Sequence, residues 1–249
     1  MQLGKNSARW KQWLQLDKPA RRRELGLFLV EGPKLLEEAL RGHHPVRHIL
    51  YDSSRFRPDP NTGAECLEVS AEMLARLSDA ETCQGVVALC EANAWPALQQ
   101  WRHIVLADGM SDPGNLGSLM RTARAAGAQA LACLGGVDPL APKVVRSSAG
   151  AVFHLPCYRL ESLAELPEGL PCIGLSPRSA LSLYQFNWPE GWVLAVGSEA
   201  HGLSPEVSSR LQATCTIPMA DGCESLNASV SAAIVLFEWR RQRQPRAHG

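Results

Sequence analysis

The 249-residue sequence lacks the long apolar runs and paired cysteine motifs that mark several classes of protein. No stretch approaches the roughly 18 uninterrupted apolar residues that a membrane-spanning helix needs. The opening MQLGKNSARW has no apolar run behind its charges, and the eight cysteines never form a C-x-x-C pair. These absences argue against a membrane span, a secretion signal, a zinc site and a disulfide framework. They predict a cytoplasmic protein with reduced thiols.

The glycine motifs of common nucleotide-binding enzymes are also missing. No G-x-G-x-x-G follows an expected strand, which argues against a dinucleotide site and against the usual glycine signature of Rossmann-like methyltransferases. G-x-S-x-G is absent, so a hydrolase nucleophile has no support. The spacing from Gly197 to Gly202 superficially resembles a phosphate loop, but no lysine follows Gly202. We therefore exclude a nucleoside triphosphate site of that type.

Basic residues are concentrated near both ends of a chain whose formal net charge is zero. Residues 1–23 carry seven basic side chains against Asp17, and residues 240–246 carry four arginines, among them Arg246, without an acid. This asymmetry suggests a polyanionic partner such as RNA, although solvated helix ends are often basic as well. Trp10 and Trp13 lie among the N-terminal charges, where they could either stack on bases or dock a helix onto the core.

The alternation of apolar and polar residues predicts an α/β fold in two parts. The first part is expected to contain helices near residues 7–17, 33–40 and 71–77 and strands at residues 27–30, 46–51 and 85–90. The segment EANAWPALQQW interrupts this pattern, and a second series begins at His103. Its strands are expected at residues 104–107, 130–134, 172–175, 192–197 and 213–217. We therefore predict domains at 1–95 and 96–249.

A first glycine-containing turn, LADGMSDPGNLGSLMRTARAAGA, leads from a strand ending at Asp108 into a helix opened by Asn115. A strand, a loop and a helix start in this order suit an anion or a cofactor. Helical spacing places Arg121 and Arg124 together, away from the apolar positions. For such a pair taken alone, ordinary surface residues that pair with acids are the commoner explanation.

Two further turns follow later strands. VLAVGSEAHGLS contains His201, which could act as a base, although a lone histidine in a loop is usually incidental. In CTIPMADGCESLNASVSAAIVLFEWRRQ, Ser225 lies where a helix should begin, and Ser225 and Asn227 could be only a cap and a first-turn residue. The expected apolar stripe of that helix comprises Leu226, Val230, Ala233, Ile234 and Phe237.

Considered together, the three turns resemble a known family. N-L-G-x-x-x-R-T-A near residue 115, G-S-E-x-x-G-L-S near 197 and I-P-M-x-x-x-x-E-S-L-N-A-S-V near 217 closely resemble the three ordered motifs of the SpoU (TrmH-type) branch of the SPOUT RNA methyltransferases. This resemblance covers about residues 103–240. The pattern from Arg22 to Leu40 is similar to the RNA substrate-binding domain often fused to that branch. One departure is Ala200, where the family usually has glycine.

The resemblance implies a C-terminal parallel-sheet SPOUT domain with a deep trefoil knot, preceded by a smaller α/β substrate-binding domain. It implies a homodimer, without metal or membrane, that transfers a methyl group from S-adenosylmethionine to a ribose 2'-hydroxyl in RNA. Ribosomal RNA is favoured as the substrate over transfer RNA. The implied cofactor-binding residues are Gly197, Ile217 and Leu226. The implied catalytic residues are Asn115, Arg121, Glu199, Ser225 and Asn227.

The sequence leaves two points open. Arg121 is the family's base, but a guanidinium is effectively always protonated, so gripping a phosphate and stabilising the developing alkoxide is an easier role to defend. The chain could also be a catalytically silent RNA-binding or ribosome-assembly factor on the same fold, or an unrelated α/β enzyme acting on a nucleotide. The intact polar residues argue against the silent factor, and the missing phosphate-loop and dinucleotide motifs argue against the unrelated enzyme.

Overall fold

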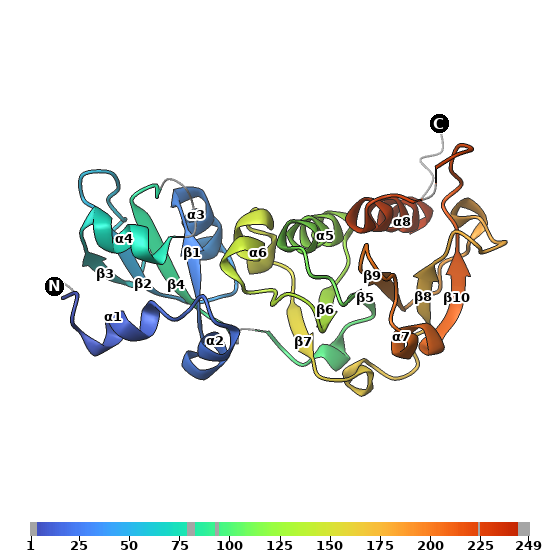
Figure 1. Cartoon of the computed structure of the whole chain (residues 1–249), viewed down its shortest axis with the longest axis horizontal. Helices are drawn as coiled ribbons and strands as arrows, with labels where there is room; N and C mark the ends of the chain where they lie inside the picture. The colour runs from blue at the N-terminus through green and yellow to red at the C-terminus, as the bar shows by residue number, and fades with distance from the viewer. Residues whose placement is uncertain (1–3, 79–82, 93–94, 224, 244–249) are drawn as a thin grey trace. The chain divides into compact units, whose positions relative to one another are not determined.

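The computed structural model describes residues 4–78, 83–92, 95–223 and 225–243, and the chain forms two compact units. The first unit comprises residues 1–95 together with 140–154, and the second comprises 96–139 and 155–249 (Figure 1). Residues 140–154, which the sequence places in the C-terminal domain, therefore cluster with the first unit. Arg246 lies outside the described residues. Among the described residues, no helix has the length and apolar character needed to cross a membrane.

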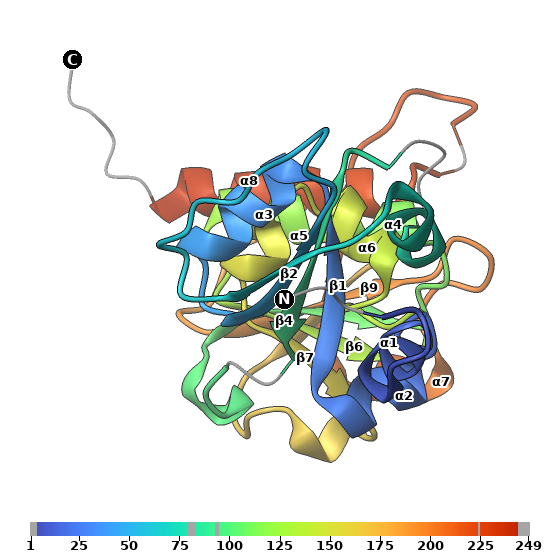
Figure 2. The same cartoon turned by 90° about the vertical axis from the view of Figure 1, so that its left-hand side faces the viewer.

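The first unit is built on a four-stranded sheet in the order β1-β4-β2-β3. β4 runs antiparallel to β1 and β2, and β3 runs parallel to β2. The strands are β1 (Leu27–Glu31), β2 (Val46–Tyr51), β3 (Glu65–Glu68) and β4 (Val86–Glu91). The helices are α1 (Ala8–Trp13), α2 (Pro19–Leu25), α3 (Pro33–Arg41), α4 (Ala71–Leu77) and α6 (Pro142–Ser147). Figure 2 shows α3 on one side of β1, with α1 and α4 on the other.

The tryptophans of α1 belong to the core of this unit. Trp10 and Trp13 are only 1% and 3% exposed and pack with apolar residues of α4 and of the sheet, including Met73 and Leu50. Ser7 caps the helix by accepting a hydrogen bond from the Trp10 backbone N–H. Of the two alternatives open from the sequence, docking is therefore the correct one, because buried rings are not available to stack on bases.

Much of the N-terminal positive charge is used within the unit. The buried Arg22 donates to the carbonyl oxygens of Leu16 and Asp17 at 2.7 and 2.9 Å. Ion pairs join Lys5 to Glu72, Arg9 to Glu65 and Arg21 to Glu24. Within the described part of the chain, only the side chains of Lys11, Lys18 and Arg23, of the seven basic residues before residue 24, form no ion pair or hydrogen bond, so fewer cations are free for a partner than the sequence suggests.

The second unit contains a six-stranded, fully parallel sheet in the order β10-β8-β9-β5-β6-β7. Its strands are β5 (His103–Asp108), β6 (Ala130–Leu134), β7 (Cys157–Leu160), β8 (Cys172–Leu175), β9 (Trp192–Gly197) and β10 (Leu211–Cys215). The long helices α5 (Pro113–Ala126) and α8 (Ala228–Arg243) cover one face, and the short α7 (Pro205–Arg210) covers the other (Figure 1). The carboxyl ends of parallel strands meet at one edge, where ligands bind in open α/β sheets.

Two boundaries near this edge differ from the sequence-based prediction. The last strand ends at Cys215, because the Thr216 backbone donates to the Leu181 carbonyl at 2.9 Å and accepts from the Leu183 N–H at 2.7 Å. Ile217 therefore lies beyond the strand. The last helix begins at Ala228 and not at Ser225.

The predicted apolar stripe of α8 is wrong. Val230 and Phe237 are 46% and 48% exposed, whereas Ala232, Val235 and Leu236 are fully buried. Both faces of this helix carry apolar residues, so the spacing alone could not select the face that packs against α5. The exposed residues Val230 and Phe237, with Leu226 before the helix, form what we call the outer face of α8.

The far ends of α5 and α8 are joined by one side chain. Arg240 of α8 donates from Nη1 to the carbonyl oxygens of Ala125 and Ala126, at 3.2 and 3.1 Å. These carbonyls lie at the end of α5, where the helix itself offers them no partner. A cation at a helix C-terminus also interacts favourably with the helix dipole. The contact fixes the two helices relative to each other.

Candidate functional site

The start of α5 positions Asn115 at the carboxyl edge of the second sheet. The Asp112 side chain caps the helix by accepting a hydrogen bond from the Asn115 backbone N–H at 2.7 Å, and Pro113 occupies the first turn. The helix therefore opens two residues before Asn115, which was expected to open it. The Asn115 side-chain amide is left free to reach outside the helix.

A tight turn after β9 presents Glu199 to the same edge. Ser198 and Gly202 exchange two backbone hydrogen bonds of 3.1 and 2.8 Å. A Cβ on Gly197 would lie 2.2 Å from the Gly202 carbonyl carbon, so only glycine allows the chain to fold back here. Ala200, the departure from the family pattern, has no positive φ and fits the turn without strain.

Asn227 caps α8 and at the same time reaches the other two motifs. Its Oδ1 accepts hydrogen bonds from the backbone N–H groups of Ser229 and Val230 at 3.0 and 3.3 Å. Its Nδ2 donates to Asn115 Oδ1 at 3.0 Å and lies 3.4 Å from Glu199 Oε1. Asn115 Nδ2 also donates to that Glu199 oxygen. We call these three side chains the Asn-Glu-Asn cluster.

The Glu199 carboxylate of this cluster is bound by amide groups and not by a positively charged side chain. Both of its amide groups donate to Glu199, and no ion pair reaches that carboxylate from the described residues. Such an arrangement fixes the orientation of two amide groups at the N-terminal ends of α5 and α8. Asn227 uses both of its N–H donors within the cluster, whereas Asn115 keeps one N–H donor that can be directed at a polar ligand.

A small pocket of about 100 Å³ lies at the ends of β8 and β10 and the start of α8. Its lining is mainly apolar with several hydroxyl groups, as is usual for a cofactor site. The lining residues are Leu175, Ser176, Pro177, Thr216, Ile217, Met219, Ser225, Leu226 and Ser231. We call this cavity the strand-end pocket.

The structure brings most of the predicted site residues to this edge, but not all of them. Ile217, Ser225 and Leu226 line the strand-end pocket, while Gly197 forms the base of the neighbouring turn. Arg121 stands apart. It follows Asn115 by six residues, which corresponds to about 9 Å along the helix axis. Its side chain is exposed and forms no hydrogen bond or ion pair with any residue that the structure describes.

Sequence reasoning missed the contribution of β8 to the pocket. Leu175, Ser176 and Pro177 belong to no motif that we recognised. The only available signal was indirect, since the expected strand at 172–175 should end at the same edge as the other parallel strands. In the described ranges, no group of three or more His, Cys, Asp and Glu side chains could hold a metal ion.

Comparisons with known proteins identify one known family in each of the two parts of the chain. The model of the SpoU rRNA Methylase family matches residues 102–237, and that of the MRM3-like substrate binding domain matches residues 8–88. The 23S rRNA (guanosine(2553)-2'-O)-methyltransferase RlmP of Bacillus subtilis is 32% identical over 236 residues, covering 92% of this chain and 95% of RlmP.

Two further similarities come from Streptomyces viridochromogenes. Its 23S rRNA (uridine(2479)-2'-O)-methyltransferase is 32% identical over 261 residues, covering 95% of this chain and 91% of the relative. The crystal structure of the SpoU methyltransferase AviRb in complex with the cofactor AdoMet superimposes with a TM-score of 0.86 at 31% identity. That superposition covers 96% of this chain and 98% of AviRb.

Proposed function

This chain belongs to the SpoU rRNA methylase family, and we propose that it methylates a ribose 2'-hydroxyl of large-subunit ribosomal RNA with S-adenosylmethionine as the methyl donor. The observation that carries the proposal is the meeting of the three motifs in the Asn-Glu-Asn cluster beside the strand-end pocket. The relatives named as 23S rRNA 2'-O-methyltransferases support ribosomal RNA as the substrate.

The strand-end pocket fits part of the cofactor. Ile217 and Leu226 offer apolar surface to a flat ring, and the hydroxyl of Ser225 lies at the same pocket. The pocket is too small for the whole molecule, so we assign it the adenosine portion, with Gly197 shaping the adjoining turn. When bound, S-adenosylmethionine supplies an electrophilic methyl carbon.

We assign the orientation of the acceptor ribose to Asn115, Asn227 and Ser225. Glu199 fixes the two asparagine amides, and a fixed donor stabilises developing charge without reorganising during the reaction. Ser225 lines the strand-end pocket two residues before Asn227 and can orient the hydroxyl for in-line attack. The 2'-hydroxyl is a weak nucleophile, so this positioning is the main contribution of these residues.

We assign Arg121 to the phosphate next to the acceptor ribose. Its guanidinium keeps its proton at any accessible pH and presents a planar fork of donors that matches a phosphate. It therefore stabilises by electrostatics the alkoxide that develops on the 2'-oxygen, while the hydroxyl proton passes to solvent water and not to the guanidinium. Its side chain is exposed and has no hydrogen-bond or ion-pair partner among the described residues, which leaves the fork available to RNA.

We propose that two copies of the chain pair through the outer face of α8 and complete the site. Two observations support pairing. Val230, Phe237 and Leu226 expose apolar side chains next to the site, and Arg121 lies away from the cluster of its own chain. A second copy would cover the apolar face and could bring its Arg121 to this site.

The double variant Val230→Glu with Phe237→Glu is expected to be a monomer. Its rate of methyl transfer is expected to fall at least about tenfold. A charge on a face that must lose water opposes association, while the buried residues that pack α8 against α5 are unchanged, so the fold should be kept. Light scattering after size-exclusion chromatography measures the mass. Leu40→Glu, at an equally exposed apolar residue of α3, is the control and should leave the mass unchanged. A dimeric double variant would disprove this interface.

Purified protein is expected to bind S-adenosylmethionine with a dissociation constant below 1 mM, on the order of −4 kcal/mol or better. It should incorporate radioactive methyl groups into ribosomal RNA isolated from cells that lack the gene. Isothermal titration calorimetry measures the first result, and mapping of 2'-O-methyl positions identifies the nucleotide. Cofactor binding without any incorporation would instead favour the catalytically silent RNA-binding protein.

Three expectations from the sequence stay predictions: the deep trefoil knot, the cytoplasmic location and the domain boundary between residues 95 and 96. We propose residues 1–95 as the substrate-binding domain and 96–249 as the methyltransferase domain. The two family matches, at residues 8–88 and 102–237, support this division.

A further inference from the structure

The first unit contains a cavity that the proposed function does not use. Its volume is about 580 Å³, and it lies beside the start of α3, the segment before β4 and the end of α6. Among its lining residues are Glu31, Lys34, Glu38, Gln84 and Arg146. We call it the α3-α6 pocket. All of its lining residues belong to the first compact unit.

The acidic side chains of the α3-α6 pocket are already engaged. Glu31 accepts a hydrogen bond from Ser78 and lies 3.6 Å from the Arg146 guanidinium. Glu38 lies 3.0 Å from the His154 ring. Glu37 pairs with Arg41 at 2.5 Å. The carboxylates therefore have partners within the protein and offer little capacity to a cationic ligand.

The donor groups of the pocket are largely free. Within the described ranges, the side chains of Lys34 and Gln84 form no hydrogen bond or ion pair, and both residues are exposed. Among the described residues, the Arg146 side chain interacts only with Glu31, at a distance too long for a hydrogen bond, so its N–H groups can bind another acceptor. The groups available to a ligand are an ammonium, a guanidinium and an amide, which together fit a phosphate with further acceptors nearby.

The backbone around the pocket favours the same kind of ligand. Gly32, with φ of 90°, leads into α3, whose N-cap makes no side-chain hydrogen bond. Pro33, the first residue of the helix, has no N–H, so the N–H groups of Lys34 and Leu35 are the ones open to an acceptor. On the opposite wall, Ala149 adopts φ of 46°, the only positive value among the described non-glycine residues. Strain of this kind is typical of functional sites.

We propose that the α3-α6 pocket binds one unpaired nucleotide of the RNA substrate, with Lys34 and Arg146 on its phosphate and Gln84 on its base or ribose. The volume exceeds what a phosphate alone requires and lies within the range of about 300–1,000 Å³ that is usual for small-molecule sites. Proteins recognise single-stranded RNA by taking up splayed nucleotides in this way. This inference rests on the proposed function, because it assumes an RNA substrate.

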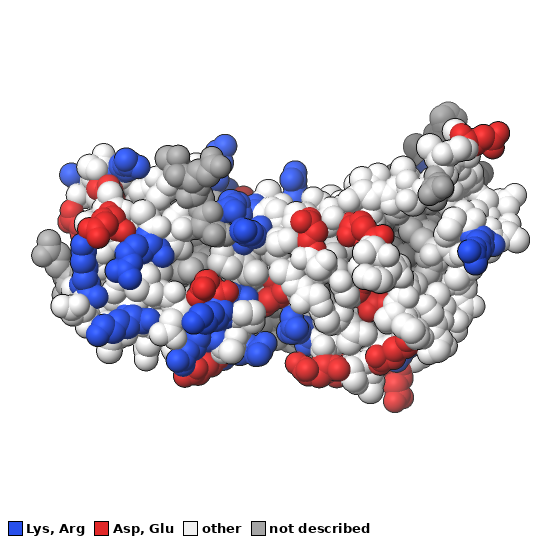
Figure 3. Space-filling model, viewed as in Figure 1, with Lys and Arg blue, Asp and Glu red and all other residues white. Residues whose placement is uncertain are grey.

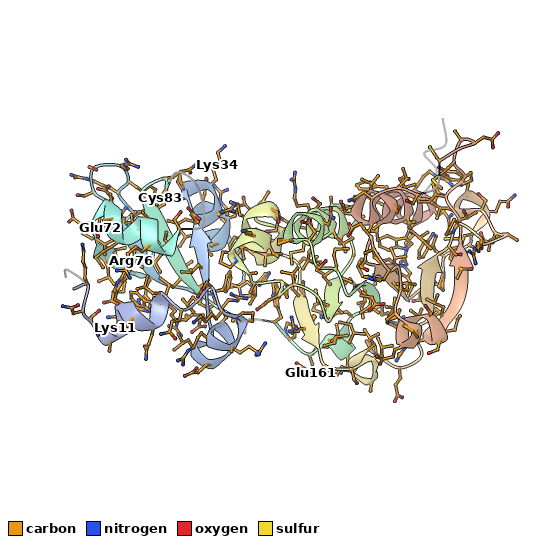
Figure 4. The ribbon with its side chains drawn as sticks, viewed as in Figure 1. Lys11, Lys34, Glu72, Arg76, Cys83 and Glu161 are labelled. Carbon is orange, nitrogen blue, oxygen red and sulfur yellow. The ribbon has the colours of Figure 1, made fainter. Side chains whose placement is uncertain are left out.

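The test compares the full-length Lys34→Gln variant with Lys11→Gln. Both lysines belong to the first unit and lack partners in the described structure, but Lys11 lies on α1, across the sheet from Lys34 (Figure 4). Figure 3 shows further basic side chains around this unit, so a matched cation is needed as a control. The probe is a 23S ribosomal RNA transcript, and its affinity is measured at several salt concentrations.

A phosphate contact to a single strand contributes about 0.7 to the slope of log affinity against log salt concentration. We expect Lys34→Gln with Arg146→Gln, which removes both cations from this one phosphate, to lower the slope by about that amount, and Lys34→Gln alone to lower it by part of that amount. Lys11→Gln should leave it unchanged. We also expect the variants to weaken binding of a single-stranded oligouridine more than binding of duplex RNA. Melting temperature and cofactor affinity should stay at wild-type values.

An unchanged slope in Lys34→Gln, or an equal change in Lys11→Gln, would overturn the α3-α6 pocket as an RNA site. A larger effect on the duplex than on oligouridine would also overturn it. The proposed function is tested separately in the same RNA by methyl incorporation with the wild-type protein. If the wild-type enzyme methylates the RNA but the Lys34→Gln and Lys11→Gln variants have equal salt slopes, only the assignment of the α3-α6 pocket as an RNA site fails.

Discussion

Arg121→Lys is expected to lower turnover by a factor on the order of 100 or more while S-adenosylmethionine affinity stays nearly unchanged. Lysine keeps the positive charge but loses the planar fork that can grip a phosphate with two parallel hydrogen bonds. Since the Arg121 side chain is exposed and forms no hydrogen bond or ion pair with the described residues, its replacement should not disturb the fold. Single-turnover methyl transfer and calorimetry measure the two quantities.

Arg124→Lys is the control for Arg121. Arg124 is also exposed on α5 and carries the same charge, but no motif residue coincides with it. Its replacement should leave turnover within about twofold, because exposed substitutions away from a site have small effects. Equal losses at the two positions, or normal turnover in Arg121→Lys, would mean that these arginines only add positive charge to the RNA-binding surface.

Asn115→Asp is expected to lower turnover about 100-fold at pH 8 and to regain activity as the pH falls. The new carboxylate would face Glu199, which now accepts a hydrogen bond from the Asn115 amide. Two unit charges about 4 Å apart repel by about 4 kcal/mol near a protein surface. Below the raised pKa of this carboxylate pair, one proton binds and restores a hydrogen-bond donor between the two groups.

The pH dependence separates charge repulsion from simple loss of the amide. Asn115→Ser removes the amide without adding charge, so its turnover should fall as well but follow the wild-type pH profile. The measurement is the initial rate of methyl transfer between pH 6 and pH 8.5 at saturating cofactor. If Asn115→Asp and Asn115→Ser have parallel profiles, Glu199 does not act through the Asn-Glu-Asn cluster.

The sequence was sufficient to predict which loops meet. Each of the three motifs follows a strand of a parallel sheet, so Asn115, Glu199 and Asn227 had to come to one edge, and the structure places them in hydrogen-bonding contact. Their mutual geometry was not predictable. It depends on Asn227 acting as a helix cap and on the close return of the chain over Gly197.

Other features depend on packing between elements that are distant in sequence. The outer face of α8 was predicted as the buried one, because α8 carries apolar residues all around and only contact with α5 decides between its faces. The α3-α6 pocket could not be predicted either. Arg146 follows Lys34 by more than a hundred residues, and no motif joins them.

The composition of the first unit has a consequence for synthesis on the ribosome. Val144, Val145 and Phe153 are buried in this unit, and Phe153 stacks on Phe28 of β1 at 6.2 Å. When residue 95 has been made, one face of the first sheet still lacks these side chains, because residues 96–139 must be translated first. At about 5–20 residues per second, the nascent chain exposes that apolar face for several seconds. The core of the first unit is therefore completed only after residues 140–154 have been synthesised, although its sheet is made first.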